Sequence, residues 1–408
     1  MPLVVQKFGG TSVADPDRMR AVADHVARCR RRGDEVTLVI SAMGKETDEL
    51  LRMADQISGD PAGREMDMLI TAGERKAVAL MCMALGELGV PAHSLTGSQA
   101  GFLTDTNHQN AKILEIRPDR IRQALDGGIV PVIAGSQGVS TERDVTFLGR
   151  GGSDTTAVAL AQALDAEMCE LYTDVSGVFS ADPRIVPSAT KMSSISFDEL
   201  LEMTATGCPK PAMRSVEVAH NYQVPLHVRS AFTWEPGTLV VEHVQEEPGM
   251  ERPIIRAVTH DQSESKVTVV DVPDKPGVSA ILFRALADAG VNVAMIVQNA
   301  SKEGRTDISF TVPSEDLELA EEVMNGGVIT DLGARSLVTD DAIGKVSVTG
   351  AGMKSNPGVA ATMFETLATN GINIEMISTS AIRISCVVHT DHTEEAVQHL
   401  HTAFGLDG

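Results

Sequence analysis

The first segment that could do chemistry is Lys7-Phe8-Gly9-Gly10-Thr11-Ser12, which follows a short apolar run near the start of the chain. Glycines lack a Cβ, so their backbone N–H groups can approach a phosphate closely, and the start of a following helix adds positive potential. Lys7 supplies a full charge beside these amides. An ordinary tight turn between a strand and a helix could have the same residues, so this segment alone leaves phosphate binding open. No G-x-x-x-x-G-K-[ST] pattern occurs, which excludes a P-loop kinase.

A second glycine-rich segment, Gly149-Arg150-Gly151-Gly152-Ser153-Asp154, stands just before the apolar helical pattern Ala157–Leu164. We expect Ser153 or Asp154 to cap this helix, and this could be their whole role. The Arg150 guanidinium is suited to bidentate contact with a carboxylate. Two glycine turns at helix starts in one domain, one with a lysine and one with an arginine, predict an anionic ligand with two ends.

The elements that must position these turns form an alternating pattern. Short β-branched runs are separated by helical patterns of period 3.6, and four of these runs are expected to be strands: Leu3–Phe8, Val36–Ser41, Ile129–Ala134 and Met168–Thr173. One helix is expected to begin at Asp15-Pro16 and to end before Gly33, with a basic last turn. The alternation predicts an α/β domain built on a mainly parallel sheet covered by helices.

Periodicity is lost between Ser230 and Pro253, and beyond that point the chain repeats itself. Pro276–Ile296 aligns with Pro357–Ile377, and each copy reads as strand, Pro-Gly turn, helix, strand, strand and helix. The first helix of each copy is expected to stop at Gly290 or Gly371. The predicted organisation is therefore a first domain at 1–230, a linker at 231–253, and two small α/β units at 254–335 and 336–408.

Composition excludes several classes of protein. With 408 residues the chain exceeds the size of one hydrophobic core, so several domains are expected. A net charge of −22 repels nucleic acid and anionic membranes. No apolar run approaches the roughly 20 residues of a membrane helix, and no export signal precedes the first strand. Five scattered cysteines without a C-x-x-C pair favour a reducing cytoplasm and no structural zinc.

Three motifs together carry a resemblance to a known family. They resemble the aspartate kinases of the amino-acid kinase family, and the repeated C-terminal units resemble the paired ACT regulatory domains of those enzymes. The resemblance covers essentially the whole chain, and its motifs stand in the expected order: Lys7-Phe8-Gly9-Gly10-Thr11-Ser12-Val13, Gly149-Arg150-Gly151-Gly152-Ser153-Asp154-Thr155-Thr156-Ala157 and Tyr172-Thr173-Asp174-Val175-Ser176-Gly177-Val178-Phe179-Ser180-Ala181-Asp182-Pro183-Arg184. It implies two ferredoxin-like ACT domains, a homodimer or larger homo-oligomer formed through them, and ATP- and Mg²⁺-dependent phosphorylation of the side-chain carboxylate of L-aspartate.

The resemblance also implies roles for individual residues. Lys7 holds the transferring phosphoryl group, and Asp154 orients the active-site lysines. Arg150 binds the α-carboxylate of the substrate and Glu74 binds its ammonium, although Glu74 could instead be an exposed carboxylate in the first turn of a helix. The remaining implied positions are, for phosphate, Gly9, Gly10 and Ser12; for the substrate, Ser41, Thr47, Gly151, Gly152 and Ser153; for the nucleotide, Thr173, Asp174, Ser180, Asp182, Arg184 and Lys210; and for an effector, Asp274, Gly277, Ser279, Asn292, Gln298, Ser301 and Asn373. No metal ligand is assigned to a protein side chain.

The physical chemistry of the reaction agrees with such a site. A carboxylate nucleophile with a pKa near 4 is already ionised at pH 7, so this transfer needs no general base. Two anions must be brought together and the charge on the γ-phosphoryl oxygens stabilised, which calls for Mg²⁺, a lysine and aimed amides.

The sequence departs from the family near the nucleotide. Pro209 stands where members usually have a lysine that contacts the nucleotide, while Lys210 is one residue later and flanked by prolines that could re-aim it. Ser176 replaces the usual Asp. These changes keep two alternatives open: a related kinase that acts on a different amino acid, and a regulatory binding protein that no longer turns over.

Two departures also lie in the repeated units. Ala294 and Ala381 replace carboxylates that are common in relatives inhibited by lysine and threonine. We therefore expect feedback by these amino acids to be weakened.

Overall fold

The computed structural model describes residues 2–59, 61–244, 254–298, 304–351, 353 and 356–407. The described chain forms two compact units. The first takes in residues 2–178, 191–204 and 209–244, and the second takes in 179–190, 205–208 and the described residues from 254 onwards. Each unit is described by itself below.

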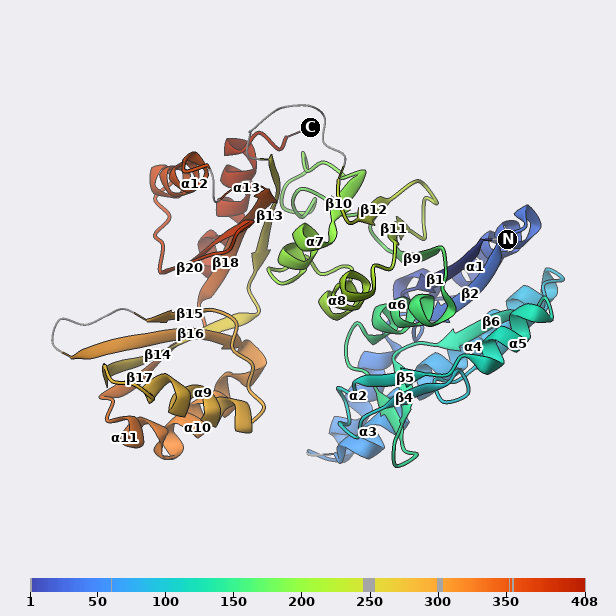
Figure 1. Cartoon of the computed structure of the whole chain (residues 1–408), viewed down its shortest axis with the longest axis horizontal. Coiled ribbons are helices and arrows are strands. Elements are labelled where there is room, and N and C mark those ends of the chain that lie inside the picture. Colours follow the sequence, from blue (N-terminus) through green and yellow to red (C-terminus); the bar gives the residue numbers. More distant parts are fainter. Residues whose placement is uncertain are drawn as a thin grey trace. The chain divides into compact units, whose positions relative to one another are not determined.

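The first unit is organised around an eight-stranded sheet (Figure 1). All its neighbouring strands pair in parallel except β11 and β12, which are antiparallel. In sheet order the strands are β10 (Ser194–Ser196), β12 (Thr238–Val241), β11 (Leu226–Ser230), β9 (Met168–Thr173), β1 (Leu3–Phe8), β2 (Glu35–Ile40), β6 (Val130–Ala134) and β3 (Ala92–Leu95). The predicted mainly parallel sheet is confirmed, and the four predicted strands are neighbours in it, in the order β9, β1, β2 and β6.

Helices cover both faces of this sheet. On one face, α1 (Pro16–Arg32) and α4 (Ala72–Glu87) pack on β2 and β6 around a core that includes Val22, Leu38 and Met81. On the other, α6 (Gly152–Leu164) packs on β1 and β9, and α8 (Met213–Tyr222) packs on α6. Since side chains alternate along a strand, the face of β1 that bears Lys7 is the one that α6 covers. The remaining helices of the unit are α2 (Glu46–Ile57), α3 (Gly63–Ile70), α5 (Asp119–Asp126) and α7 (Phe197–Thr204).

Helix α1 shows how local signals set these boundaries. The Asp15 carboxylate accepts a hydrogen bond from the Arg18 amide at the helix start, Pro16 is the first helical residue, and Gly33 ends the helix in the left-handed conformation. The predicted start and end of this helix are confirmed.

A smaller sheet in the same unit contains β5 (Ile113–Ile116), β4 (Phe102–Thr104), β7 (Gln137–Ser140) and β8 (Val145–Phe147). Strand β8 leads directly into the second glycine turn, and the loop between β4 and β5 lies beside it, because the Ala111 amide donates to the Phe147 carbonyl over 3.0 Å. The small sheet therefore supports one side of that turn.

A buried polar cluster lies between strand β9 and helix α1. The Tyr172 hydroxyl lies 3.0 Å from both His25 Nε2 and Glu170 Oε2, and Arg229 Nη1 donates to Glu170 Oε1 over 2.7 Å. Burial is the main reason that the pKa of His25 falls to about 4, so this imidazole is neutral at pH 7. Trp234 stacks on it with ring centroids 4.1 Å apart. The cluster therefore gives His25 a structural role.

The second unit contains two four-stranded antiparallel sheets (Figure 1). One contains β15 (Ile296–Gln298), β16 (Arg305–Pro313), β14 (Glu264–Pro273) and β17 (Ser336–Asp340), with helices α9 (Val278–Asp288), α10 (Leu317–Val323) and α11 (Ile329–Leu332). The other contains β13 (Ile254–Asp261), β18 (Ile343–Ala351), β20 (Arg383–His389) and β19 (Met376–Thr379), with helices α12 (Gly358–Thr369) and α13 (Thr393–Ala403). The two copies predicted from the repeat are the two sheets with their helices.

Sheet pairing differs from the predicted ranges 254–335 and 336–408 at two strands. Strand β13 precedes the first copy in sequence but pairs with β18 of the second. Strand β17 falls in the predicted second range but pairs with β14 of the first. The first copy is thus inserted between β13 and the rest of the second, an arrangement that depends on pairing between distant residues and leaves no local trace in the sequence.

The second unit also includes a short segment, 179–190, whose flanking residues belong to the first unit. Its Ala181 and Val186 are part of the core formed by β18, α12 and α13. The Val258 amide donates to the Ser180 carbonyl over 2.7 Å, and Ser188 Oγ donates to Asp407. This segment therefore packs on the sheet that contains β13 and β18 and on helix α13.

Candidate active site

Backbone hydrogen bonds connect the carboxyl ends of three neighbouring parallel strands of the large sheet, β9, β1 and β2. The amide of Gly9, just after β1, donates to the Tyr172 carbonyl of β9 over 3.3 Å. The amide of Ser41, just after β2, donates to the Phe8 carbonyl of β1 over 3.1 Å. Open α/β sheets bind ligands at the carboxyl ends of their strands. The first glycine turn begins there, whereas the second follows β8 of the smaller sheet.

The first glycine turn requires glycine at its second position. A Cβ on Gly10 would lie 2.8 Å from the Ala42 carbonyl oxygen and 2.9 Å from that of Gly44. Gly10 begins a short 3₁₀ helix, so its amide belongs to the first turn, where N–H groups lack intrahelical partners. The Gly9 amide is already used by Tyr172, and Ser12 Oγ is buried without a hydrogen-bond partner among the described residues. Gly10 and Ser12 are thus better placed than Gly9 to bind a phosphate.

Lys7 and Asp154 meet directly in this structure. Lys7 Nζ lies 2.6 Å from Asp154 Oδ1, and both side chains are about nine-tenths buried, with 12 % and 11 % exposed. The other carboxylate oxygen of Asp154 accepts a hydrogen bond from the Ala212 amide over 3.1 Å. The pair comes from β1 and α6, so it joins the two glycine turns.

The predicted capping role of Ser153 and Asp154 is wrong. Helix α6 begins at Gly152 after Gly151, whose φ of 71° is left-handed, and no side chain caps it. Ser153 and Asp154 lie in the first turn and point inwards, because Ser153 Oγ shares a 2.9 Å hydrogen bond with Ser136 Oγ and Asp154 binds Lys7. Both residues are therefore inside the site.

Glu74 lies in the first turn of α4 and is only 3 % exposed. Its interpretation as an exposed carboxylate is therefore wrong. Burial raises the pKa of Glu74 to about 7, although the amides of Glu74 and Ala42 stabilise its charged form. Its Oε2 is buried and has no hydrogen-bond partner among the described residues. A buried carboxylate with an unused oxygen is suited to bind a cationic group such as an ammonium.

Arg150 extends into solvent from the second glycine turn. Its side chain is 89 % exposed, and Nη1 lies 4.0 Å from Asp48 Oδ1 on α2. Ser41 and Thr47 are half-buried between the end of β2 and the start of α2. The guanidinium is therefore accessible to a substrate carboxylate and makes no close ion pair within the part of the chain that the structure describes.

Thr173, Asp174 and Lys210 form a cluster at the end of β9. Lys210 Nζ lies 2.7 Å from Asp174 Oδ1, and Thr173 Oγ1 donates to the same oxygen over 2.8 Å. Partial burial alone would raise the pKa of Asp174, but these hydrogen bonds outweigh it and lower the pKa. Lys210 thus places a positive charge beside β9, although Pro209 stands where the family lysine was expected.

Ser180, Asp182 and Arg184 lie in the segment 179–190 of the second unit. Ser180 Oγ is buried and shares a 2.8 Å hydrogen bond with His401 Nε2 of α13. Arg184 Nη2 donates to Asp182 Oδ2 over 2.6 Å on the surface. The Ser180 hydroxyl is therefore used within the protein, whereas the Arg184 side chain is exposed and accessible to an anionic ligand.

The predicted effector positions surround the start of α9 and the ends of the repeated helices. Ser279 Oγ donates to Gln298 Oε1 over 3.1 Å, and the Asp274 amide donates to the Gly304 carbonyl. Gly277 precedes α9 in the left-handed conformation. Asn292 and Asn373 are exposed at equivalent places after α9 and α12, and Ser301 lies outside the described residues.

Arg214 was not predicted as a functional residue. It is the second residue of α8, where a positive charge interacts unfavourably with the helix dipole. An arginine at such a position in the sequence could have indicated that its side chain has specific partners. Its guanidinium donates from Nη1 to the Leu148 carbonyl over 2.8 Å and from Nη2 to the Ala111 carbonyl over 2.7 Å.

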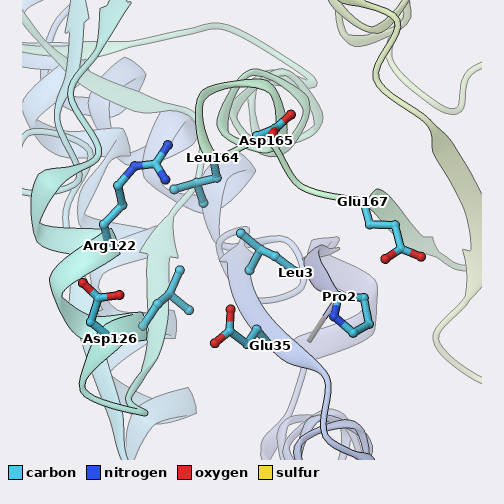
Figure 2. Close-up of a pocket in the computed structure, with 9 residues that line it drawn as sticks. Pro2, Leu3, Glu35, Arg122, Asp126, Leu164, Asp165 and Glu167 are labelled. Atoms are coloured by element: carbon cyan, nitrogen blue, oxygen red, sulfur yellow. The ribbon is translucent and has the colours of Figure 1, made fainter.

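A pocket of about 440 Å³ lies at the other end of the large sheet's strands, where β1 and β2 begin. Figure 2 shows Leu3 and Glu35, the first residues of β1 and β2, lining it with Arg122, Asp126 and Asp165. Carboxylates outnumber the single guanidinium, so the pocket does not suit a phosphate. It is separate from the candidate site, which lies at the carboxyl ends of these strands.

Comparisons with known proteins agree on one family. The model of the amino acid kinase family matches residues 2–230, and the ACT domain model matches residues 267–326 and 346–404. The aspartokinase of Mycolicibacterium smegmatis is 52 % identical over all of this chain and 97 % of its own length. The crystal structure of aspartate kinase from Synechocystis is 44 % identical, with a TM-score of 0.55 over 99 % of this chain and 69 % of its own.

The fold is matched more closely by another solved structure. Aspartokinase III of E. coli, in complex with aspartate and ADP in the R-state, has a TM-score of 0.82 with 24 % identity. The match covers 98 % of this chain and 99 % of that one.

Proposed function

Because the chain belongs to the amino acid kinase family, with an aspartokinase relative 52 % identical over its whole length, we propose that its site transfers the γ-phosphoryl group of ATP to L-aspartate. The acceptor is the side-chain carboxylate, and the products are 4-phospho-L-aspartate and ADP. The observation that carries this assignment is the arrangement of Lys7 and Asp154 between the two glycine turns, with the buried Glu74 nearby in the same unit.

Each end of aspartate has a suitable partner in the first unit. The exposed Arg150 fork fits the α-carboxylate, and the unused oxygen of Glu74 fits the ammonium. With both groups held, the side-chain carboxylate is left to face the phosphoryl group. Orienting the reactants in this way removes much of the entropic barrier to a bimolecular step.

The transfer itself needs charge stabilisation and no protein base. An ionised carboxylate oxygen of aspartate forms the new bond to γ-phosphorus as the bond from phosphorus to the bridging oxygen of ADP breaks, and the electron pair leaves with ADP. Lys7 stabilises the charge on the γ-phosphoryl oxygens, and Asp154 keeps the ammonium aimed at them. The Gly10 amide and Ser12 are available to the same oxygens.

We infer that Mg²⁺ enters as part of the substrate, bound to ATP. Among the described residues no group of three or more His, Cys, Asp or Glu could hold a metal ion. The carboxylates of Asp154 and Asp174 are each bound by a lysine. Mg²⁺ usually keeps several waters and takes phosphate oxygens, which fits a site whose protein groups are mainly cationic.

An acyl-phosphate assay tests this proposal. The purified full chain would be incubated with Mg-ATP and each of the twenty amino acids, with ADP release and trapping of the acyl phosphate by hydroxylamine as readouts. We expect both signals with L-aspartate. Strong turnover with another amino acid and none with aspartate would contradict the proposed substrate, and no ADP release with any of them would contradict the proposed activity.

The two alternatives left open by the sequence are not favoured. Aspartate kinase of Pseudomonas fluorescens is 47 % identical over the full chain, which leaves little support for a different amino-acid substrate. A catalytically weakened regulatory homologue would not need the paired Lys7 and Asp154 or the buried Glu74, each of which is retained in a fitting environment.

We also propose a cytoplasmic homodimer formed through the ACT sheets. Strands β15 and β19 are edges of their sheets, and Ile296 and Ile377 on them are 53 % and 44 % exposed. Such edges favour pairing with another copy. Light scattering after size-exclusion chromatography would test the dimer.

Within the described residues, every helix is too short or too polar to span a bilayer.

A further inference from the structure

The residues that connect the two ends of the site lie in one short segment, Lys210–Arg214, which ends in the first turn of α8 and which we call the connector. At its start, Lys210 Nζ binds Asp174 Oδ1 over 2.7 Å, in the cluster proposed to bind the nucleotide. The connector, this cluster and both glycine turns all belong to the first unit.

The middle of the connector contacts the catalytic pair. The Ala212 amide donates to Asp154 Oδ2, while Asp154 Oδ1 binds Lys7. The Ala212 side chain also lies against the second glycine turn, because a Cβ on Gly151 would be 2.5 Å from the Ala212 Cβ. A shift of Ala212 would therefore disturb both Asp154 and the turn.

The end of the connector holds the base of the same turn. Arg214 binds the carbonyl of Leu148, the residue before the turn, and the carbonyl of Ala111 in the neighbouring loop, over 2.8 and 2.7 Å. These acceptors belong to two chain segments, and the planar fork of arginine presents two donors at a fixed spacing that reaches both. Burial lowers the pKa of Arg214, and the nearby Asp105 and Glu217 oppose this effect. An arginine side chain nevertheless stays protonated in proteins, so the guanidinium keeps its five donors.

We propose that Arg214 is a positioning residue for the turn that carries Arg150, and that the connector couples aspartate binding to nucleotide binding. The second part rests on the proposed function of the site. A nucleotide that orders Lys210 also orders Ala212 and Arg214, because they are close together in one short segment. The turn that must bind the aspartate carboxylate is then held in its binding geometry. By thermodynamic linkage, aspartate strengthens nucleotide binding by the same factor.

The test compares Arg214→Met with Arg30→Met in the full chain. Arg30 is a matched control, since it also bridges carbonyls of two segments, those of Asp34 and Gly128, but at the opposite edge of the sheet. Steady-state kinetics would give KM for aspartate, KM for ATP and kcat. Calorimetric titration would give the affinity for aspartate with and without saturating Mg-ADP.

We expect Mg-ADP to strengthen aspartate binding to the unsubstituted protein by a factor within about 5- to 150-fold, the usual range of coupling between two sites. In Arg214→Met this coupling factor should fall below about twofold. The KM for aspartate should rise about tenfold or more, whereas kcat should change much less, because a misplaced binding group mainly weakens affinity. Arg30→Met should resemble the unsubstituted protein in all of these quantities.

Two results would overturn the proposal. One is an active protein in which Arg214→Met and Arg30→Met have the same KM and coupling factor; the other is an unsubstituted protein that binds aspartate equally well with and without Mg-ADP. If Arg214→Met does not fold, Arg214→Lys replaces it and should give a smaller change in the same direction. Absence of aspartate-dependent ADP release from the unsubstituted protein would instead reject the proposed function.

Discussion

Lys7 Nζ and Asp154 Oδ1 lie 2.6 Å apart, and this ion pair joins the end of β1 to the first turn of α6. Each of the two glycine turns lies next to one member of the pair. A phosphoryl group bound to the first turn and an amino acid bound to the second would therefore meet beside the Lys7 ammonium. Under the proposed function, the pair marks the place of phosphoryl transfer, and the Lys7 ammonium is the charge that acts there.

Removal of the Lys7 charge should abolish most turnover. In Lys7→Ala we expect kcat to fall by about a hundredfold or more, because a charge aimed at the transferring group acts mainly in the transition state. ADP release would be measured beside a thermal melt. Arg20→Ala is the control, since Arg20 forms a 2.7 Å pair with Asp17 on the surface, where both side chains are largely exposed, and it should be dispensable. Near-normal kcat in folded Lys7→Ala would remove Lys7 from the mechanism.

Arg150 should affect only the amino-acid end. We expect Arg150→Ala to raise KM for aspartate by about tenfold or more, since a charge-assisted bidentate contact is lost, and to leave KM for ATP nearly unchanged. Because the side chain is 89 % exposed, the melting temperature should not change. Arg120→Ala, at another exposed arginine, serves as the control. A larger change in KM for ATP than for aspartate would reverse the assignment of the two ends.

The activity should depend on the ionisation of Glu74, whose pKa burial raises to about 7. Only the carboxylate attracts the substrate ammonium, so KM for aspartate should rise by up to about tenfold per pH unit below pH 7. In Glu74→Gln, KM at pH 8 should be raised and its dependence on pH between 6 and 8 should disappear. The same dependence in Glu74→Gln would assign the titration to another group.

Stability should follow the opposite trend at Glu74. The folded-state pKa lies above the ordinary value of 4.5, so the folded protein holds this proton more tightly than the unfolded chain does. Ionisation of Glu74 between about pH 4.5 and pH 7 therefore weakens the fold as pH rises. Thermal melts at pH 8 should show Glu74→Gln to be at least as stable as the unsubstituted protein, and a clear loss of stability would contradict the effect assigned to burial.

Millimolar lysine plus threonine should inhibit this enzyme weakly or not at all. Ala294 and Ala381 offer no carboxylate to an effector ammonium. Each missing charge-assisted hydrogen bond weakens binding by roughly 1.5–3 kcal/mol, or about ten- to hundredfold. Glu375, which could supply a charge nearby, is already paired with Lys266.

Activity measured with lysine, threonine and both together would test this expectation. Half-inhibition below about a millimolar would show that the two alanines do not weaken the effector site. If inhibition is absent, the double variant Ala294→Asp with Ala381→Glu should restore part of it.

Features set by neighbouring residues could be predicted from the sequence. Strands β1 and β9 have the predicted bounds, and α1 begins after Asp15 and ends at Gly33, because runs of β-branched residues and capping residues act locally. The second glycine turn was also found. Its Ser153 was misassigned to a cap, because a side chain in a helix's first turn can face inwards when a partner such as Ser136 is available.

Features that depend on distant partners could not be predicted. The depth at which Glu74 is buried, the two carbonyls that bind Arg214 and the packing of Ser180 on His401 each require the folded chain. The exchange of β13 and β17 between the sheets is of the same kind, since it depends on pairing with β18 and β14, which lie far away in the sequence.

This exchange constrains the order in which the chain can fold as it leaves the ribosome. Strand β13 emerges before the whole of the first ACT sheet, but its sheet neighbour among the described strands, β18, is made after that sheet is complete. A nascent chain that has reached Asp340 can close the first sheet while β13 still has an open edge and an uncovered Val258. Slow synthesis at this point would expose a strand edge to other nascent chains, so stalling just after β17 should be the step most prone to aggregation.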